Sequence, residues 1–194
     1  RGDVVTNLNW AWHHHGNEGT ENVIWMDVLD VPLVTTLGAT TYDYDYAKEG
    51  DADPHFISVT EPSSRSEDLF STGGIYPTFV HGSDVSATPQ VVFRWEHTRE
   101  TLERMKKYDG DPYDGIIVEL GRTMTGERIY KTMSVYMQLL RPGEKTRTHR
   151  HSSSAVYCVL EGQGYTQVGD KRLDWKTNDM FCLPTWSWHH HVNL

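Results

Sequence analysis

Residues 186–193 read Trp-Ser-Trp-His-His-His-Val-Asn, and residues 10–17 read Trp-Ala-Trp-His-His-His-Gly-Asn. The two octapeptides agree at six of eight positions, which indicates that one supersecondary unit occurs twice in the chain. A third histidine cluster, His149-Arg150-His151, precedes the second octapeptide and has no counterpart near the first. Only the second copy therefore looks complete.

The composition is that of an acidic chain of ordinary domain size. The 194 residues carry a formal net charge of -9, and the basic residues are scattered, so we predict no nucleic-acid partner. No apolar run approaches the roughly 18 to 20 residues that span a bilayer, and no charged-then-apolar leader opens the chain. Cys158 and Cys182 lie outside any Cys-x-x-Cys pattern, and we expect buried free thiols. These features predict a cytoplasmic protein without a membrane partner.

From Gly115 onward, the chain consists of short apolar segments separated by turn residues such as Gly162, Gly164 and Asn178. Strands are predicted at residues 116–120, 130–140, 146–151, 155–160, 165–168, 171–175, 180–183 and 186–192. Many short strands at even spacing are typical of a sandwich or small barrel. We predict an all-β, antiparallel barrel of jelly-roll type.

Residues 95–108 form the one segment with a clear helical pattern. Apolar or buried-type side chains recur at a spacing near 3.6, at Trp95, Thr98, Leu102 and Met105. Two favourable i,i+4 ion pairs support the helix, namely Glu100–Arg104 and Glu103–Lys107. We expect this helix to pack on the outside of a sheet. Closer to the N-terminus, residues 4–5 and 23–26 look like strands, and residues 32–46 are ambiguous.

The histidines suit a metal site in the second copy. His149 and His151 are two apart, so in a strand both imidazoles lie on one face and Arg150 on the other. His189, on a later strand, can complete a set of three ligands. Imidazole suits Fe, Zn, Cu and Ni, so the ligand type does not choose the metal. The alternative is that the histidines merely fill a polar interior, although eight of the 11 fall in the three clusters.

The spacing of these residues resembles the two consensus motifs of the cupin superfamily: Gly143-x5-His149-x-His151 with a later Gly162, and Asn178-x5-Pro184-x4-His189-x3-Asn193. Ala155 stands where many cupins carry a glutamate ligand, which implies a three-histidine variant. Together with Trp-x-Trp-His-x-His, this pattern is similar to the gentisate 1,2-dioxygenase family of bicupin ring-cleaving dioxygenases, which includes salicylate and 1-hydroxy-2-naphthoate dioxygenases. Residues 16–34 also resemble the segment after that family's first iron motif.

The resemblance implies a bicupin in which each barrel is a double-stranded β-helix. We therefore expect residues 1–42 to be the C-terminal remnant of a first, incomplete cupin barrel whose other ligand strand lies before Arg1. Residues 43–110 are expected to form a linker that contains the exterior helix. Residues 111–194 are expected to form a second cupin barrel that is truncated at its end.

The resemblance also implies a catalytic Fe(2+) and a homotetramer. In that family the catalytic iron usually sits in the first barrel, where His13 matches the third ligand. His15 and Asp27 match catalytic and substrate-binding positions of that barrel. In the second barrel the equivalents are His191 and Tyr157. Tyr157 stands where the family's first barrel has an arginine. Without that positive charge, we expect weaker binding of an anionic substrate in the second barrel.

The chemistry of three imidazoles agrees with such a function. They leave Fe(II) its full positive charge, so a 2-hydroxybenzoate can chelate through carboxylate and phenolate while O2 takes a remaining position. A histidine two residues beyond a ligand can donate a hydrogen bond to the bound substrate, and His15 and His191 are the candidates. His190 and Trp188 should face outward, with Trp188 packing there.

We predict an extradiol-type dioxygenase that acts on gentisate or a related small aromatic acid and O2. The first alternative is that the second barrel is a non-catalytic structural or metal-binding module of such an enzyme. The second is a different cupin chemistry, such as a quercetinase-like or isomerase reaction, or a Zn or Ni site.

Overall fold

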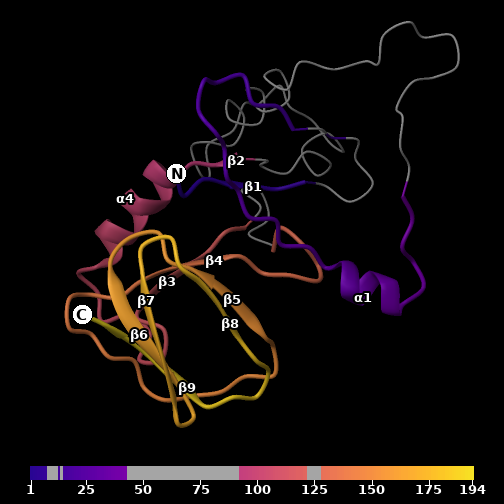
Figure 1. Cartoon of the computed structure of the whole chain (residues 1–194). Coiled ribbons are helices and arrows are strands. Elements are labelled where there is room, and N and C mark those ends of the chain that lie inside the picture. Colours follow the sequence, from indigo (N-terminus) through magenta and orange to yellow (C-terminus); the bar gives the residue numbers. More distant parts are fainter. Residues whose placement is uncertain (8–12, 14, 43–91, 122–127) are drawn as a thin grey trace, which may run out of the picture. The chain divides into compact units, whose positions relative to one another are not determined.

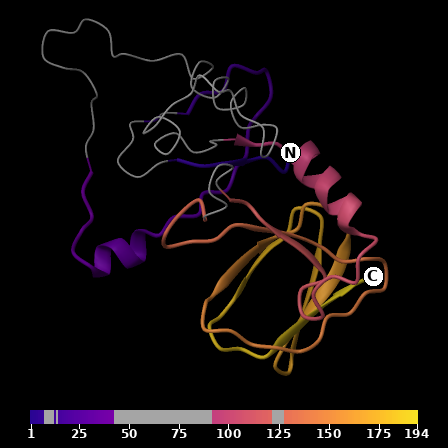
Figure 2. The same cartoon turned by 180° about the vertical axis from the view of Figure 1, so that it is seen from behind.

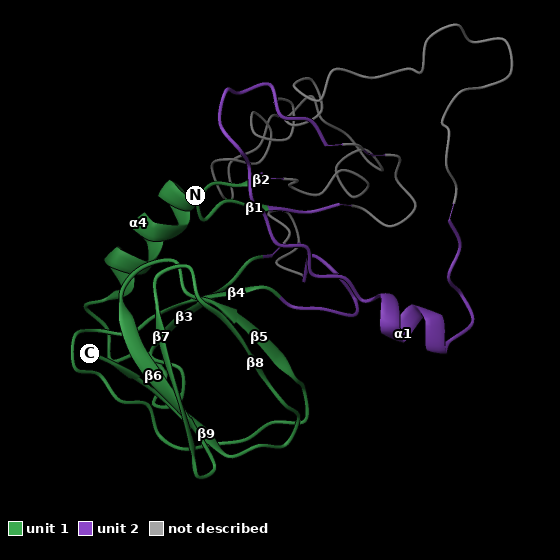
Figure 3. Ribbon diagram, in the orientation of Figure 1, with its two compact units in different colours: residues 1–4, 93–120, 135–194 green, residues 5–92, 121–134 purple. Residues whose placement is uncertain are grey.

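The computed structural model describes residues 1–7, 13, 15–42, 92–121 and 128–194. The chain divides into two compact units (Figure 3). Unit 1 contains Arg1–Val4, Phe93–Leu120 and Val135–Leu194, and unit 2 contains Val5–Val92 and Gly121–Ser134. No helix within the described ranges has the length and apolar character needed to cross a membrane.

Unit 1 contains most of the strands. Their bounds are β3 (Ile116–Glu119), β4 (Tyr136–Leu139), β5 (Ala155–Cys158), β6 (Gln163–Val168), β7 (Lys171–Lys176), β8 (Met180–Leu183) and β9 (His189–Asn193). All pairs are antiparallel: β3 with β4, β5 with β8, and β6 with both β7 and β9. In both views, β5 to β9 curve around a common interior (Figures 1 and 2). The predicted antiparallel all-β fold is confirmed.

The segment before β5 joins the free edge of β9 without forming the predicted strand at residues 146–151. It pairs at two isolated bridges, Lys145 with Val192 and His149 with His189. Between them the Arg147 N–H donates instead to the carbonyl of Pro112 at 2.8 Å. The two bridges are four residues apart along this segment and three apart along β9, so a bulge of one residue interrupts the ladder.

The interior of unit 1 is partly polar. Leu183 is 1% exposed, but Thr166 and His189 are as deeply buried, at 0% and 1%. Cys158 and Cys182 are free and exposed, so the prediction that they are buried is wrong. β5 and β8 alternate, and Val156 and Met180 share this exposure at 50% and 57%, because these strands leave one face open to solvent.

The predicted helix is α4 (Trp95–Met105), which buries Thr98 and Leu102 and contacts β3 and β4. Glu100 pairs with Arg104 as predicted. The second predicted pair is wrong, because Glu103 pairs with Lys106 at 2.7 Å. Lys107 lies over the Tyr108 ring instead, 5.2 Å from its centroid. The α-helix ends at Met105, three residues earlier than predicted.

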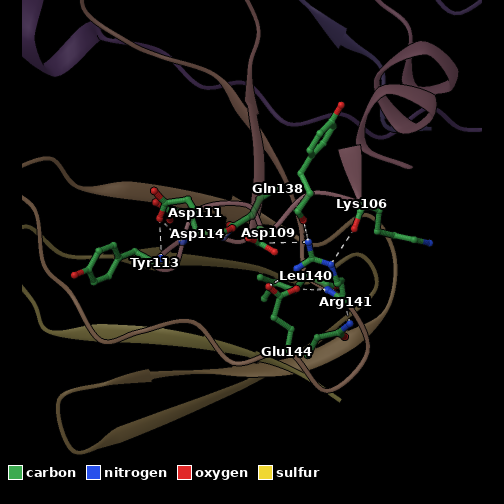
Figure 4. Close-up of polar contacts among 11 residues, drawn as sticks. Lys106, Asp109, Asp111, Tyr113, Asp114, Gln138, Leu140, Arg141 and Glu144 are labelled. Carbon is green, nitrogen blue, oxygen red and sulfur yellow. Dashed lines mark hydrogen bonds and ion pairs between the residues drawn. The ribbon is translucent and has the colours of Figure 1, made fainter. Parts of the chain in front are cut away.

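Arg141 holds the chain where α4 ends (Figure 4). Its guanidinium donates to the carbonyls of Lys106, Tyr108 and Asp109, and its Nη1 lies 2.9 Å from Oε1 of Glu144. Carbonyls at the end of a helix have no partner within it, and a cation there satisfies them. The turn after β4 thereby fixes the loop that follows α4.

Unit 2 contains a short helix, α1 (Val31–Thr36), in the range that the sequence left ambiguous. Pro32 lies in its first turn, where a missing N–H does no harm. The predicted strand at residues 23–26 is wrong: the segment is irregular, and Ile24 is 95% exposed, because no described strand pairs with it. The short strands β1 (Val4–Val5) and β2 (Val92–Phe93) lie at the boundary of the two units.

Much of the expected linker, residues 43–91, lies outside the described residues, as do residues 8–12 and His14. The division into residues 1–42, 43–110 and 111–194 stays a prediction.

Candidate metal centre

Three histidine side chains converge in unit 1. His149, His151 and His189 each offer a ligand atom, and these atoms all lie within 4.8 Å of one another. Among the described residues this is the single group of three or more ligand-type side chains that is close enough to hold a metal. The ring centroids of His149 and His189 are 4.2 Å apart, and those of His151 and His189 are 5.1 Å apart.

Backbone pairing brings the three rings together. The N–H of His149 donates to the carbonyl of His189 at 2.9 Å, and the reverse bond is 2.8 Å long. On the same side, the N–H of Trp186 donates to the carbonyl of His151 at 2.9 Å. Backbone hydrogen bonds therefore join the segment that carries His149 and His151 to the segment that carries His189.

Each of the three rings is also oriented by a backbone carbonyl. Nδ1 of His149 lies 3.3 Å from the carbonyl of Arg147, Nδ1 of His151 lies 2.7 Å from that of Ser153, and Nδ1 of His189 lies 2.9 Å from that of Ser187. A carbonyl oxygen only accepts, so each Nδ1 carries the proton and each Nε2 keeps its lone pair. This pattern is typical of metal-binding histidines. Nε2 of His189 is buried and has no hydrogen-bond partner among the described residues.

At His189 the surroundings favour the neutral imidazole that metals bind. Burial lowers the pKa of His189, and the neighbouring His149 and His151 lower it further. Oδ1 of Asp114 lies 4.0 Å from Nε2 of His149 and is the carboxylate oxygen nearest to this ring among the described residues.

His191 and Tyr157 lie beside the three histidines. Their rings are 5.0 Å apart, and the His191 ring is 5.5 Å from that of His189. Burial lowers the pKa of His191 to about 3, with His189 as the next cause. Burial, followed by Asp114, raises the pKa of Tyr157 to about 12. Both side chains are therefore neutral at pH 7, and Nε2 of His191 is buried without a partner among the described residues.

Asp114 and Tyr113 also approach His149, from the loop after α4, and neither was predicted from the sequence. The Tyr113 ring lies 5.4 Å from that of His149. Oδ1 of Asp111 accepts hydrogen bonds from the N–H groups of Tyr113 and Asp114 at 2.7 and 3.1 Å (Figure 4). Residues 111–115 read Asp-Pro-Tyr-Asp-Gly, which is turn chemistry, but a turn alone does not predict which strand it contacts.

The exterior of this region is aromatic and basic. Trp188 is 52% exposed and Trp186 is 56% exposed, so Trp188 faces outward as predicted. The Arg150 guanidinium lies over both rings, 4.4 Å from the centroid of Trp186 and 4.5 Å from that of Trp188. Arg150 thus lies outside while its neighbours His149 and His151 turn inward. His190 is half-buried, with its Nδ1 3.2 Å from Oγ1 of Thr148.

The candidates in and shortly after the first octapeptide lie in unit 2. His13, His15 and Asp27 are exposed. The rings of His13 and His15 are 5.6 Å apart, and the His15 ring lies 5.4 Å from that of Trp25. These three side chains belong to unit 2, whereas His149, His151 and His189 belong to unit 1, and the roles of His13, His15 and Asp27 stay predictions.

Comparisons with known proteins agree with this arrangement. A family described as Cupin domain matches residues 136–194. A gentisate 1,2-dioxygenase from Haloferax sp is 35% identical over 196 residues, which cover 97% of this chain and 53% of that protein. A 5-aminosalicylate 1,2-dioxygenase from Comamonas sp is 33% identical over 195 residues, covering 98% of this chain and 49% of that protein.

The chain is a relative of the gentisate 1,2-dioxygenases. The resemblance seen in its motifs and the predicted cupin fold are confirmed. A crystal structure of a salicylate 1,2-dioxygenase from Pseudoaminobacter salicylatoxidans with gentisate matches 84% of this chain and 44% of that chain, with a TM-score of 0.65 at 21% identity, which shows the fold. The chain spans about half the length of the curated relatives that it matches.

Proposed function

We propose that the chain supplies the iron centre of an extradiol-type, non-haem Fe(II) dioxygenase. The substrate is gentisate or a related 2-hydroxybenzoate, and the reaction inserts both atoms of O2 to open the ring between the carboxylate-bearing and hydroxylated carbons. The observation that carries the proposal is the convergence of His149, His151 and His189 with every Nδ1 held by a carbonyl. The gentisate and 5-aminosalicylate activities of the relatives supply the substrate class.

The donor set fits a divalent transition metal. Three neutral imidazoles suit Fe(II), and they suit Zn(II) and Ni(II) as well. A bound metal would give the buried Nε2 of His189 the partner that it otherwise lacks. We assign Fe(II) to His149, His151 and His189 because the relatives are dioxygenases, and metal analysis of protein purified without chelator tests that assignment.

The metal, when bound, would supply a Lewis acid that gathers the carboxylate and phenolate oxygens of the substrate together with O2. The chain's own residues orient the reactants. We propose that the buried Nε2 of His191 hydrogen-bonds the substrate, and that the Tyr157 ring lines its site. Tyr157 is itself held by Phe181, whose ring stacks on it with centroids 4.9 Å apart.

Turnover by the iron-loaded chain tests the proposal. The protein is loaded with Fe(II) without oxygen and then mixed with gentisate and oxygenated buffer, while the absorbance of the ring-opened product and O2 uptake are followed. We expect one O2 consumed for each gentisate. Iron-loaded protein that binds the metal in a 1:1 ratio and leaves gentisate intact contradicts the proposal.

The alternative is a metal-binding module without turnover, and one observation favours it. Tyr157 is a neutral phenol and Asp114 carries a carboxyl group, so neither side chain offers a positive charge to the carboxylate of the substrate. In that case gentisate would be cleaved elsewhere in the enzyme. Replacing His149 with Ala in the active enzyme would then leave turnover largely intact, whereas His13→Ala would abolish it. The proposal that the second copy is the working site predicts the reverse, and equal losses contradict the idea of one working site.

Homotetrameric assembly, cytoplasmic location and the absence of a nucleic-acid partner stay predictions. His15 and Asp27 are proposed to bind substrate only at a site built around His13.

A further inference from the structure

Thr166 contacts His191 on the side of the ring away from its free nitrogen. Nδ1 of His191 lies 2.8 Å from Oγ1 of Thr166. The same oxygen accepts a hydrogen bond from the indole Nε1–H of Trp175 at 3.0 Å. Thr166 is 0% exposed, so water does not reach its hydroxyl group.

Counting protons fixes the direction of the hydrogen bond between Thr166 and His191. The indole of Trp175 only donates, so the Thr166 hydroxyl must place its own proton elsewhere. Nδ1 of His191 is the one other hydrogen-bond partner of this hydroxyl among the described residues. If Nδ1–H donated to Thr166, the hydroxyl proton would be buried without an acceptor, which is unfavourable. A doubly protonated ring would also donate from Nδ1, and it would leave the same hydroxyl proton of Thr166 without an acceptor.

We infer that the Thr166 hydroxyl holds His191 in the Nε2–H tautomer, so that His191 is a hydrogen-bond donor to an anionic oxygen of the metal-bound substrate and not a fourth metal ligand. The protein thereby divides four neighbouring histidines into two classes. Carbonyl oxygens give His149, His151 and His189 a lone pair on Nε2, and a hydroxyl gives His191 a proton there. Carboxylate and phenolate oxygens are the acceptors that this donor fits. The identity of the acceptor rests on the proposed function, whereas the tautomer does not.

Gly164 makes room for this arrangement. It lies within β6, not in a turn as the sequence suggested, and pairs with Trp175 across the sheet. A Cβ at this position would lie 2.4 Å from Cη2 of Trp175 and 2.1 Å from the carbonyl oxygen of Val192. Because Gly164 has no side chain, the indole can occupy this space, and its Nε1–H reaches Thr166. Thr166 and Trp175 are therefore positioning residues for His191.

The tautomer can be measured in the metal-free chain. Long-range proton–nitrogen correlation spectra of uniformly 15N-labelled protein distinguish Nδ1–H from Nε2–H imidazoles, and the His191→Asn variant identifies the His191 signals by their loss. We expect His191 as Nε2–H, with His149, His151 and His189 as Nδ1–H. An Nδ1–H His191 in the wild-type protein overturns the inference, whether or not the iron-loaded chain cleaves gentisate.

Two buried threonines provide a matched pair of variants. Thr146, 3% exposed, also contacts His191, but its Oγ1 accepts a hydrogen bond from the backbone N–H of His191 at 2.9 Å and not from the ring. Thr166→Val should remove the Nε2–H preference, Thr166→Ser should restore it, and Thr146→Val should leave it unchanged. Loss of the preference in Thr146→Val as well would overturn the assignment to Thr166.

Binding of salicylate to the Zn(II)-loaded protein tests the donor role. Thr166→Val should weaken binding by about 10-fold, because a hydrogen bond to a charged acceptor is lost, and Thr166→Ser should recover most of it. Unchanged salicylate affinity in Thr166→Val overturns the donor role. If the tautomer and affinity behave as expected but iron-loaded protein leaves gentisate intact, the proposed function fails and this inference stands.

Discussion

The two histidine octapeptides give their rings the same local geometry in different surroundings. The His13 and His15 rings are 5.6 Å apart with planes at 69°, and the His189 and His191 rings are 5.5 Å apart with planes at 67°. Yet His13 and His15 are exposed, whereas His189 and His191 are 1% and 3% exposed. The repeated sequence therefore sets the spacing of the ring pair, and the surrounding chain determines its chemistry.

What surrounds the second pair comes from elsewhere in the sequence. The segment at residues 145–153 adds two more imidazoles and the carbonyls that orient them, and β6 adds the hydroxyl of Thr166. No described residues supply a comparable ligand set around His13. A single repeated motif thus has a metal-binding geometry in one place, whereas the described residues of the other copy include a pair of exposed rings.

Removing one ring from each copy should give the largest difference. His189→Ala removes a ligand whose Nε2 is buried, so we expect metal affinity to fall by more than about 100-fold, beyond the 10- to 100-fold range of changes around a ligand. His13→Ala should leave the affinity unchanged. Titration with Co(II) in competition with a coloured chelator measures both. Similar losses in the two variants would show that the copies form one site or two equivalent sites.

The sequence predicted those features that depend on local pattern. Alternation placed His149 and His151 on one side and Arg150 on the other, and turn residues separated the strands, because side-chain direction and turn chemistry follow from neighbours in the chain. Residues 116–119, 155–158 and 180–183 are strands as expected.

Features that depend on tertiary partners were not predictable. The strand expected at residues 23–26 is irregular because it has no described partner, and Gly164 lies inside a strand because Trp175 covers it. Asp114 and Thr166 reach the histidines from segments whose own patterns show only a turn and a strand. Periodicity indicates which side chains share a face, but it does not say which distant residue that face meets.

Burial around the two copies can be compared through stability. Leu183 is 1% exposed on β8, whereas Ile24, in the unit that carries the first copy, is 95% exposed. Leu183→Ala should lower the free energy of unfolding by about 3 kcal/mol, through lost burial and the cavity left behind. Ile24→Ala should change it by less than about 0.5 kcal/mol. Urea denaturation followed by tryptophan fluorescence measures both. A large loss from Ile24→Ala would mean that Ile24 is covered in solution.

The smallest of these effects concerns the exposed stack of Arg150 with Trp186 and Trp188. Arg150 stands between His149 and His151, and the two tryptophans precede His189 by three residues and one residue. The stack therefore ties together, from outside, the same two segments that the backbone pairs join inside. Trp186 also has a positive φ of 58°, a conformation that is unfavourable for a bulky side chain and that contacts such as this one help to maintain.

Arg150→Ala should lower metal affinity by about 10-fold. Each exposed cation–π contact contributes about 0.5 to 1 kcal/mol, and two of them correspond to roughly that factor. Arg172→Ala is the matched control, because the Arg172 guanidinium lies 3.9 Å from the ring centroid of half-buried Tyr165 and pairs with Asp174, but Arg172 adjoins none of the three proposed ligands. Arg150→Lys should retain most of the affinity, since the cation stays over the rings. If Arg150→Ala and Arg172→Ala bind Co(II) alike, the stack does not hold the histidines, and the difference between the two octapeptides lies in the interior alone.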